Sequence, residues 1–338
     1  MIISWNTTRS CNLKCQHCYR DAGVRDTNEL TTAEGKKLLE EIARAGFKIM
    51  VFSGGEPLMR EDIYELIAHA KKLGLRPVLG SNGTLIDAAA AQKLREAGAA
   101  RVGISIHSST PEFHDSFHQS PGSWQGAIDG VKYCLEAGLE VQIHTTVTEP
   151  NYDEVEQVTD LAVKLGASAH HVFFLVPTGR GKDLAKQMLE AARYEKLLNR
   201  IMEKQKAIDI ELKPTCAPQF MRIAKQKGMN MRFTRGCLAG TSYCVITPNG
   251  DVNPCPYLSL KVDNVHETPF DEIWRSNPVF LRLRSMELGG RCGTCEYKEI
   301  CGGCRARAFY QTGGDYMAED HWCLYKAGKA GRAEVVAR

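Results

Sequence analysis

Three cysteines near the N-terminus are the residues of this chain best suited to chemistry. The spacing CxxxCxxC unites Cys11, Cys15 and Cys18 in one short loop. Three thiolates leave a tetrahedral zinc site one ligand short, and they leave one iron of a four-iron cluster without a protein ligand. An enzyme needs such an open iron if a small molecule must chelate the cluster. A zinc knuckle completed by His17 and plain buried thiols are the alternatives, although a histidine between Cys15 and Cys18 would strain the loop.

A second group of thiols lies in the last third of the chain. It comprises eight cysteines: Cys237, Cys244, Cys255, Cys292, Cys295, Cys301, Cys304 and Cys323. Eight thiols make two complete four-cysteine shells, so the spacing alone allows two iron–sulfur clusters or a pair of structural zinc ribbons. The total of 13 cysteines is odd and tightly grouped, which indicates metal ligation in a reducing compartment rather than a disulfide framework.

Two cysteines fall outside these groups. Cys134 lies on the apolar face of an expected helix, where we expect core packing. Cys216 stands in the polar, proline-rich sequence KPTCAP between the two expected domains. A free thiol there could give a substrate a proton or a hydrogen atom, and an inert buried thiol is the alternative.

Strand-like and helix-like stretches alternate from residue 1 to about residue 208. A glycine closes helix after helix, at Gly46, Gly74, Gly98, Gly138 and Gly166, as a repeated β/α unit requires. The strand-like stretches are rich in Val, Ile and Phe, which is typical of buried parallel strands. We therefore predict an α/β fold in which six β/α units form a partial (β/α)6 TIM-type barrel. Catalytic groups are expected at the carboxyl ends of its strands.

The character of the sequence changes near residue 235. Cys, Gly and Pro become frequent, which indicates a small domain held by metal rather than by a large core. We predict a barrel at 1–208, a linking segment at 209–234, a cysteine-rich domain at 235–326 and a frayed tail at 327–338. The net charge of +3 is too small to favour a nucleic-acid partner. Because the chain shows neither a signal-peptide pattern nor an apolar run of membrane-spanning length, we expect a cytoplasmic protein that is handled without oxygen.

The two groups of cysteines resemble those of known iron–sulfur enzymes. CxxxCxxC behind an N-terminal strand resembles the radical S-adenosylmethionine (SAM) superfamily, in which the open iron of a [4Fe–4S] cluster binds SAM. The order of the cysteines over residues 237–323 resembles the auxiliary-cluster (SPASM) domain of peptide and cofactor maturases. The resemblance implies three [4Fe–4S] clusters: a SAM cluster on Cys11, Cys15 and Cys18, auxiliary cluster I on Cys237, Cys244, Cys255 and Cys304, and auxiliary cluster II on Cys292, Cys295, Cys301 and Cys323. The gap between Cys301 and Cys304 is one residue shorter than the commonest form.

The resemblance also implies a SAM pocket at the strand ends. One part is the SGGEP turn, which contains Ser53, Gly54, Gly55 and Glu56. Its glycines let the backbone approach a ligand, and Glu56 accepts hydrogen bonds from the amino group of SAM. The other expected pocket residues follow the next three strands: Ser81, Asn82, Ser105, His107 and His144. Relatives often carry an acidic residue in place of His107, so we expect the ribose contact from Ser105. A hydrogen-bonded barrel residue is the alternative for His144.

Four further stretches resemble one branch of the superfamily. SWNTT…CYRDAG, FFLVPTGRG, KPTCAP and CGGCRARA are similar to the group of haem d1 and alternative-haem enzymes. This resemblance implies an activity like that of the didecarboxysirohaem deacetylases. A 5′-deoxyadenosyl radical from reductive SAM cleavage would then start the removal of acetate side chains from a sirohaem-derived tetrapyrrole. Arg20 and Arg180 are the candidates for binding its carboxylates, and an electron donor such as ferredoxin or flavodoxin is implied.

Two other functions remain open. A radical SAM maturase acting on a ribosomally made precursor peptide would use the same clusters. Such enzymes commonly carry a module that grips a leader peptide, and this chain starts ten residues before Cys11, so we expect that module to be absent. The other is a non-catalytic metal or electron-transfer protein, against which the open iron of the three-cysteine motif argues.

Overall fold

One curved sheet organises the molecule. In the computed structural model, which describes residues 1–326, ten strands lie in the order β10-β9-β8-β1-β2-β3-β4-β5-β6-β7. They are β1 (Ile2–Asn6), β2 (Ile49–Ser53), β3 (Arg76–Ser81), β4 (Arg101–Ser105), β5 (Glu140–Val147), β6 (Ala169–Phe174), β7 (Glu211–Thr215), β8 (Tyr243–Ile246), β9 (Asp251–Asn253) and β10 (Asp263–Asn264). The strands from β8 through β7 in this order are parallel, whereas β9 is antiparallel to both of its neighbours.

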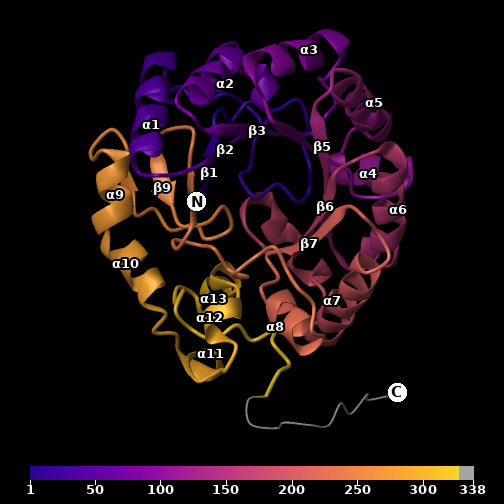
Figure 1. Ribbon diagram of the computed structural model, residues 1–338, viewed down its shortest axis with the longest axis vertical. Coiled ribbons are helices and arrows are strands. Elements are labelled where there is room, and N and C mark those ends of the chain that lie inside the picture. Colours follow the sequence, from indigo (N-terminus) through magenta and orange to yellow (C-terminus); the bar gives the residue numbers. More distant parts are fainter. Residues whose placement is uncertain (327–338) are drawn as a thin grey trace.

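Helices surround this sheet (Figure 1). The α-helices are α1 (Thr32–Arg44), α2 (Ile63–Lys72), α3 (Ala88–Ala97), α4 (Pro111–His118), α5 (Ser123–Glu136), α6 (Val155–Leu165), α7 (Ala191–Gln205), α8 (Gln219–Gln226), α9 (Phe270–Ser276), α10 (Pro278–Ser285), α11 (Gly290–Gly293), α12 (Lys298–Cys301) and α13 (Arg305–Thr312). The 3-10 helices are η1 (Pro57–Met59), η2 (Glu149–Glu154) and η3 (Gly179–Gln187). Within residues 1–326, no helix has the length and apolar character needed to cross a membrane.

Local sequence signals explain where the barrel helices begin and end. The side chains of Thr31 and Glu34 form a capping box at the start of α1, where the Thr31 N–H donates to Glu34 at 2.8 Å. Gly98 and Gly166 end α3 and α6 in the left-handed conformation, with φ of 90° and 84°. These signals confirm the repeated β/α units that the sequence predicts.

The barrel strands have an apolar face toward the helices and a polar face toward the interior of the barrel. Trp5, Phe52 and Val102 are fully buried in the main hydrophobic core, together with side chains of the surrounding helices. Neighbouring positions carry polar groups. The Gln142 side chain, for example, lies 2.6 Å from the Nε2 atom of His144. Because side chains alternate along a strand, the same strands build a dry outer core and a polar interior.

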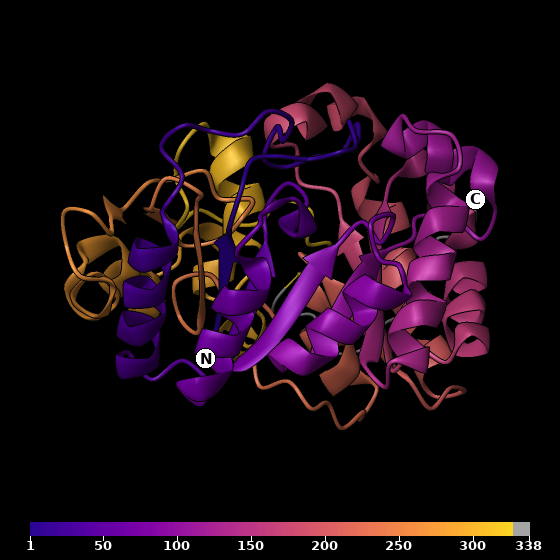
Figure 2. The ribbon, with the colours of Figure 1, turned by 90° about the horizontal axis from the view of Figure 1, so that it is seen from above.

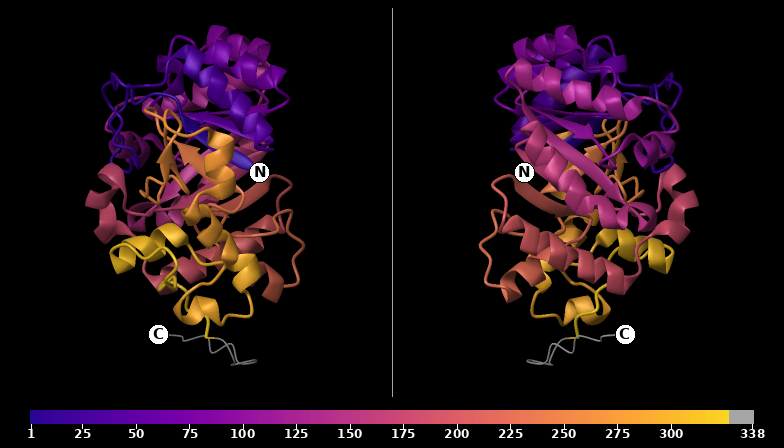
Figure 3. Two further views of the ribbon diagram at one scale, coloured as in Figure 1. Left: turned by 90° about the vertical axis from the view of Figure 1, so that its left-hand side faces the viewer. Right: turned by 90° about the vertical axis from the view of Figure 1, so that its right-hand side faces the viewer.

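The cysteine-rich segment completes the ring. β8 pairs in parallel with β1, and Cys244 lies opposite Ile3. Farther along the chain, α9 packs against α1 and α12 packs against α8. The helices α9 to α13 therefore lie on the side of the ring that the barrel strands leave open, as Figures 1 and 3 show. Seen from above, these C-terminal segments, in orange and yellow, gather at one side of the molecule (Figure 2).

The predicted fold class, a partial barrel followed by a cysteine-rich domain, is confirmed. Within the segment expected to be a linker, β7 extends the parallel sheet beyond β6 as its edge strand. The structure adds α4, a short helix between β4 and α5 that the sequence analysis does not anticipate. The domain boundaries themselves stay predictions, and the tail at 327–338 lies outside the described residues.

Candidate active site

The CxxxCxxC loop follows β1 and lies against the SGGEP turn that follows β2. The Gly55 N–H donates to the Thr8 carbonyl at 2.7 Å, and the Glu56 N–H donates to the Ser10 carbonyl at 2.7 Å. A Cβ atom at Gly55 would lie 2.1 Å from the Ser10 oxygen, and one at Gly54 would lie 2.5 Å from the Thr8 oxygen. The two glycines are therefore needed for close packing against the backbone that leads into the cysteine loop.

The loop that follows β6 also packs against the cysteine loop. Gly179 has φ +57°, and a Cβ atom there would lie 2.5 Å from the Cys18 oxygen. The Arg180 guanidinium donates to the carbonyl oxygens of Cys15 at 3.0 Å and Ala22 at 2.6 Å. It also pairs with Asp21 at 2.9 Å. Arg180 thus holds the cysteine loop, and its contact with a substrate carboxylate stays a prediction.

The three thiols of the loop are neighbours. Cys11, Cys15 and Cys18 belong to one loop, and the thiols of Cys11 and Cys18 are near enough to Cys15 to raise its pKa, together with burial. Burial raises the pKa of Cys11 to about 11 and that of Cys15 to about 12. Backbone N–H groups point at two of the sulfurs, at 3.5 Å for Cys11 and 3.4 Å for Cys18. Three convergent thiols with backbone donors fit the ligand set of an iron–sulfur cluster that keeps one iron open.

The ring of His17 packs against α4. Its ring stacks on Phe117 with 4.1 Å between centroids and lies 4.4 Å from the ring of His107. Ligand atoms of Cys15, His17 and His118 lie within 4.8 Å of one another. This group has three members and leaves out two cysteines of the loop, whereas a structural zinc site takes four ligands. The structure therefore does not group the three cysteines with His17 as a zinc knuckle would require.

Glu56 is a buried carboxylate at the strand ends. It is fully buried and accepts hydrogen bonds from the Ser81 hydroxyl at 3.0 Å and from the Asn82 N–H at 2.9 Å. Burial raises its pKa to about 7, although these hydrogen bonds act in the opposite direction. The Asn82 side chain donates in turn to Asn12 in the cysteine loop at 2.9 Å. The structure thus brings Glu56, Ser81 and Asn82 together beside the loop, and their contacts with SAM stay predictions.

The remaining residues of the expected pocket have different surroundings. Ser53 ends β2 and Ser105 ends β4, both at the carboxyl edge of the sheet. His107 is 2% exposed, accepts a hydrogen bond from the Thr146 N–H and packs behind the cysteine loop. His144 lies in the polar interior, where a Cβ atom on Gly103 would clash with its ring at 2.5 Å. Direct contacts of these residues with SAM stay predictions.

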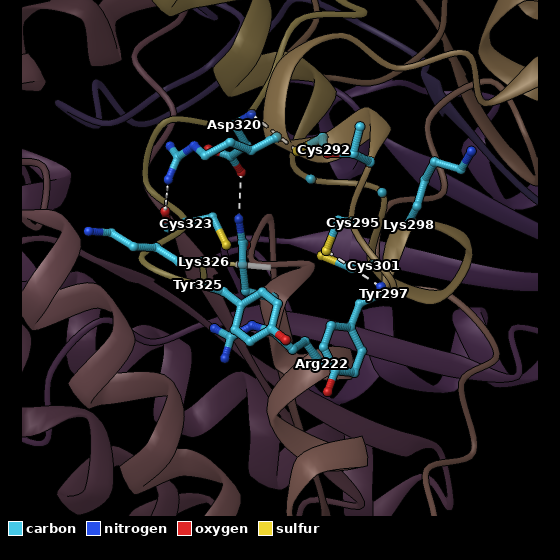
Figure 4. A pocket seen from close by; sticks show the side chains of 15 residues that line it. Arg222, Cys292, Cys295, Tyr297, Lys298, Cys301, Asp320, Cys323, Tyr325 and Lys326 are labelled. Atoms are coloured by element: carbon cyan, nitrogen blue, oxygen red, sulfur yellow. Dashed lines mark hydrogen bonds between the residues drawn. The ribbon is translucent and has the colours of Figure 1, made fainter. Parts of the chain in front are cut away.

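The expected residues of auxiliary cluster II surround one cavity (Figure 4). The cavity has a volume of about 250 Å³, and its walls carry Cys292, Cys295, Cys301 and Cys323. Backbone N–H groups point at the sulfurs of Cys292, at 3.5 Å, and Cys295, at 3.4 Å. Four cationic side chains also line it: Arg222, Arg291, Lys298 and Lys326. The thiols, the space and the positive surroundings fit a negatively charged four-iron cluster.

The residues expected for auxiliary cluster I are not all together. Cys304 and Cys255 belong to one small packed group, and Cys237 acts electrostatically on both. Cys244 is fully buried in the main hydrophobic core instead. Cys216 packs in the same group as Cys255 and Cys304. The structure thus unites three of the four expected thiols and places Cys216 beside them.

A buried ion pair that the sequence analysis does not identify connects the two auxiliary sites. Arg307 and Asp320 are both fully buried and lie 2.5 Å apart. Burial alone would raise the pKa of Asp320, but Arg307 and hydrogen bonds from Cys304 and Gln219 lower it to about 2. Asp320 accepts from the Cys304 N–H at 2.8 Å, and the Cys323 N–H donates to its carbonyl at 3.1 Å. The charged residues inside CGGCRARA were the only sequence signal for this pair.

Comparison with known proteins shows which families and relatives this chain resembles. Residues 5–162 match the radical SAM superfamily, and residues 237–305 match the iron-sulfur cluster-binding domain SPASM. The AdoMet-dependent heme synthase of Nitratidesulfovibrio vulgaris is 44% identical, covering 96% of this chain and 92% of that protein. The AdoMet-dependent heme synthase of Methanosarcina barkeri is 43% identical, covering 97% of each protein. The Fe-coproporphyrin III synthase of M. barkeri is 30% identical, covering 99% of this chain and 90% of that protein.

Solved structures show the same fold. Streptococcus suis SuiB bound to S-adenosylmethionine is 19% identical with a TM-score of 0.75, covering 96% of this chain and 77% of SuiB. The resemblance to haem-related radical SAM enzymes is therefore confirmed, and this protein is an enzyme. Its radical SAM domain implies a [4Fe–4S] cluster and SAM, and its SPASM domain implies further iron–sulfur clusters. The chain belongs to the radical SAM superfamily, in the part of it that carries a SPASM domain.

Proposed function

We propose that this enzyme forms haem from an iron porphyrin by converting two propionate side chains to vinyl groups. The observation that carries the proposal is a difference between two relatives from one organism. The chain is 43% identical to the AdoMet-dependent heme synthase of M. barkeri and 30% identical to its Fe-coproporphyrin III synthase, over nearly the full length in both cases. Because the chain is more similar to the haem synthase than to the Fe-coproporphyrin III synthase of the same organism, the comparison favours haem synthesis.

The residues of the barrel are suited to prepare this reaction. A reduced [4Fe–4S] cluster with bound SAM supplies an organic radical that abstracts a hydrogen atom. Cys11, Cys15 and Cys18 would hold that cluster, and Glu56 would accept hydrogen bonds from the amino group of SAM. The close packing at Gly55 and the hydrogen bond from Arg180 to the Cys15 carbonyl hold the cysteine loop in place relative to the strand ends, so that the reacting groups stay in position.

The electron balance of the conversion fits an enzyme with auxiliary clusters. Each propionate gives up one hydrogen atom, one electron and carbon dioxide, and becomes a vinyl group. The substrate therefore releases one electron for each electron that the cleavage of SAM consumes. Clusters in the SPASM domain would carry the released electron away from the substrate, and a ferredoxin or flavodoxin would supply the electron for SAM.

A cleft beside the SGGEP turn carries two arginines that are suited to bind a substrate carboxylate. The cleft has a volume of about 170 Å³, and its lining includes Arg9 and Arg20, the acidic Asp26, and Gly54 and Gly55. The Arg20 guanidinium donates to the Asn6 side chain, at 2.6 Å from its Nε atom, in the amide orientation that satisfies both groups. This volume admits one propionate arm rather than a whole macrocycle. We therefore assign Arg20 to a substrate carboxylate.

A second candidate function is the removal of acetate groups from a sirohaem-derived tetrapyrrole, which the sequence resemblance implies. The 30% identity to an Fe-coproporphyrin III synthase over 99% of the chain supports it. Both candidates need the same hydrogen abstraction but on different side chains. The substrate and the side chain lost therefore distinguish them.

The test is an anaerobic reaction of the reconstituted enzyme with SAM, a reductant and one tetrapyrrole at a time. The two substrates are Fe-coproporphyrin III and didecarboxysirohaem, and mass spectrometry identifies the products. We expect haem from Fe-coproporphyrin III, with two molecules of 5′-deoxyadenosine for each haem. Loss of acetate groups from didecarboxysirohaem, with Fe-coproporphyrin III unchanged, would replace this proposal by the second candidate. Deoxyadenosine with both tetrapyrroles unchanged would contradict both and favour a peptide substrate.

A further inference from the structure

Cys216 lies where the barrel meets the cysteine-rich segment. It directly follows β7 and has φ +60°, which a residue other than glycine rarely adopts. Its side chain packs with Cys255 and Cys304. Burial raises the pKa of the Cys216 thiol, the nearby thiols of Cys304, Cys255 and Cys237 raise it further, and Arg307 lowers it. Four thiols from four separate stretches of the chain thus meet at one place.

Backbone contacts fix this meeting point. A Cβ atom on Gly236 would lie 2.6 Å from the Pro218 oxygen, so the chain enters Cys237 in direct contact with the loop that carries Cys216. The Arg307 guanidinium donates to the Cys216 carbonyl at 3.0 Å. The ion-pair partner of Arg307, Asp320, accepts a hydrogen bond from the Cys304 N–H. One buried ion pair therefore holds both Cys216 and Cys304, which are far apart in the sequence.

Cys244 has the opposite surroundings. It lies on β8 and is fully buried in the main hydrophobic core, where the charged group that acts on it is Arg284. The preceding residue, Tyr243, bonds to Ser4 on the side of the sheet opposite the main hydrophobic core. Because side chains alternate along a strand, Cys244 faces away from that side. A one-residue shift of β8 along β1 would be needed to reverse it, and that shift would disrupt the paired core residues.

We infer that Cys216, and not Cys244, is the fourth ligand of auxiliary cluster I, together with Cys237, Cys255 and Cys304. On binding, the Cys216 thiol releases its proton and its sulfur bonds to iron. The cluster then links the loop after the last barrel strand to the SPASM domain. Bound to iron, Cys216 is not available to give a hydrogen atom to a substrate. The inference depends on the SPASM domain and not on the identity of the tetrapyrrole.

The test compares two substitutions in full-length protein whose SAM cluster has been removed by Cys11→Ala, Cys15→Ala and Cys18→Ala, so that all remaining iron belongs to the auxiliary sites. Cys216→Ala removes the proposed ligand. Cys244→Val is the matched control, because it fills the core position with an apolar side chain of similar size. Iron and sulfide are measured after anaerobic reconstitution, and Mössbauer spectra report the cluster types. Gel filtration and circular dichroism confirm that both variants are folded.

The expected result is a change in one variant alone. Cys216→Ala should lose the iron of one cluster or convert that cluster to a three-iron form, while Cys244→Val keeps the iron content and the spectrum of the parent. A Cys216→Ala protein with unchanged iron and spectrum overturns the inference. Loss of cluster iron in Cys244→Val overturns it as well, because Cys244 would then be required at the cluster. None of these measurements uses a tetrapyrrole, so their outcome is independent of the proposed function.

Discussion

The protonation of Glu56 should control the binding of SAM. Burial raises the pKa of this carboxyl to about 7, although hydrogen bonds from Asn82, Leu58 and Ser81 lower it. The amino group of SAM donates hydrogen bonds, and therefore favours the ionised carboxylate. A proton competes for the same oxygens, so the affinity for SAM should fall as the pH drops through 7.

The size of this effect follows from the pKa. With a pKa of about 7, roughly nine tenths of Glu56 is ionised at pH 8 and roughly one tenth at pH 6. The contribution of the carboxylate to SAM affinity should therefore fall about tenfold between these pH values, which corresponds to about 1.4 kcal/mol. Glu56→Gln does not titrate, so it serves as the reference that removes the effects of pH on SAM itself and on the cluster.

The assay is anaerobic equilibrium dialysis of labelled SAM against the reconstituted enzyme. Dissociation constants are measured at pH 6, 7 and 8 for the wild type and for Glu56→Gln. The ratio of the variant constant to the wild-type constant should rise about tenfold from pH 6 to pH 8. A ratio that stays constant with pH refutes the reasoning, and so does a variant that binds SAM as tightly as the wild type at pH 8.

Three further substitutions test the surroundings of the sites. Gly55→Ala places a Cβ atom 2.1 Å from a backbone oxygen of the cysteine loop. SAM cleavage should fall about 100-fold, whereas Gly23→Ala, at an open position, should leave the rate of deoxyadenosine formation unchanged. Asp320→Asn leaves the buried charge of Arg307 without its partner. The free energy of unfolding in urea should therefore fall by about 3–5 kcal/mol, and the iron content of the auxiliary sites should drop. Unchanged stability would contradict a role for this pair. Burial lowers the pKa of His170 to about 3, so below pH 6.5 the unfolded chain binds a proton that the folded chain does not. As the pH decreases from 6.5 toward 3, the free energy of unfolding of the wild type should therefore fall by about 1.4 kcal/mol per pH unit more than that of His170→Gln. Free energies from urea unfolding that depend on pH in the same way in both proteins would contradict this.

The ligand set expected for the SAM cluster follows from local spacing, and that expected for auxiliary cluster II follows from the resemblance to SPASM domains; the structure places Cys292, Cys295, Cys301 and Cys323 around one cavity, and the clusters themselves stay predictions. Cys11, Cys15 and Cys18 occupy one loop, so their convergence requires no knowledge of the fold. The thiols expected at auxiliary cluster I come from distant stretches of the chain. The face on which Cys244 lies depends on the pairing of β8 with β1, about 240 residues apart in sequence, and no local pattern specifies that register.

The barrel was predictable from its local signals, whereas the contacts between loops were not. A glycine in the left-handed conformation closely follows α1, α2, α3, α5 and α6, and α1 and α3 also begin with a side-chain cap, so the ends of these helices were predictable. α4 has the polar, histidine-rich sequence PEFHDSFH, which lacks a regular apolar stripe. The role of Arg180 in holding the cysteine loop depends on a tertiary contact between residues more than 150 positions apart.

The transfer of deuterium from substrate to SAM-derived product tests the central claim most directly. Fe-coproporphyrin III is labelled at the propionate carbons attached to the ring and is incubated anaerobically with the enzyme, SAM and a reductant. We expect haem together with 5′-deoxyadenosine that carries one deuterium atom. Unlabelled 5′-deoxyadenosine with the porphyrin left unchanged would contradict this expectation.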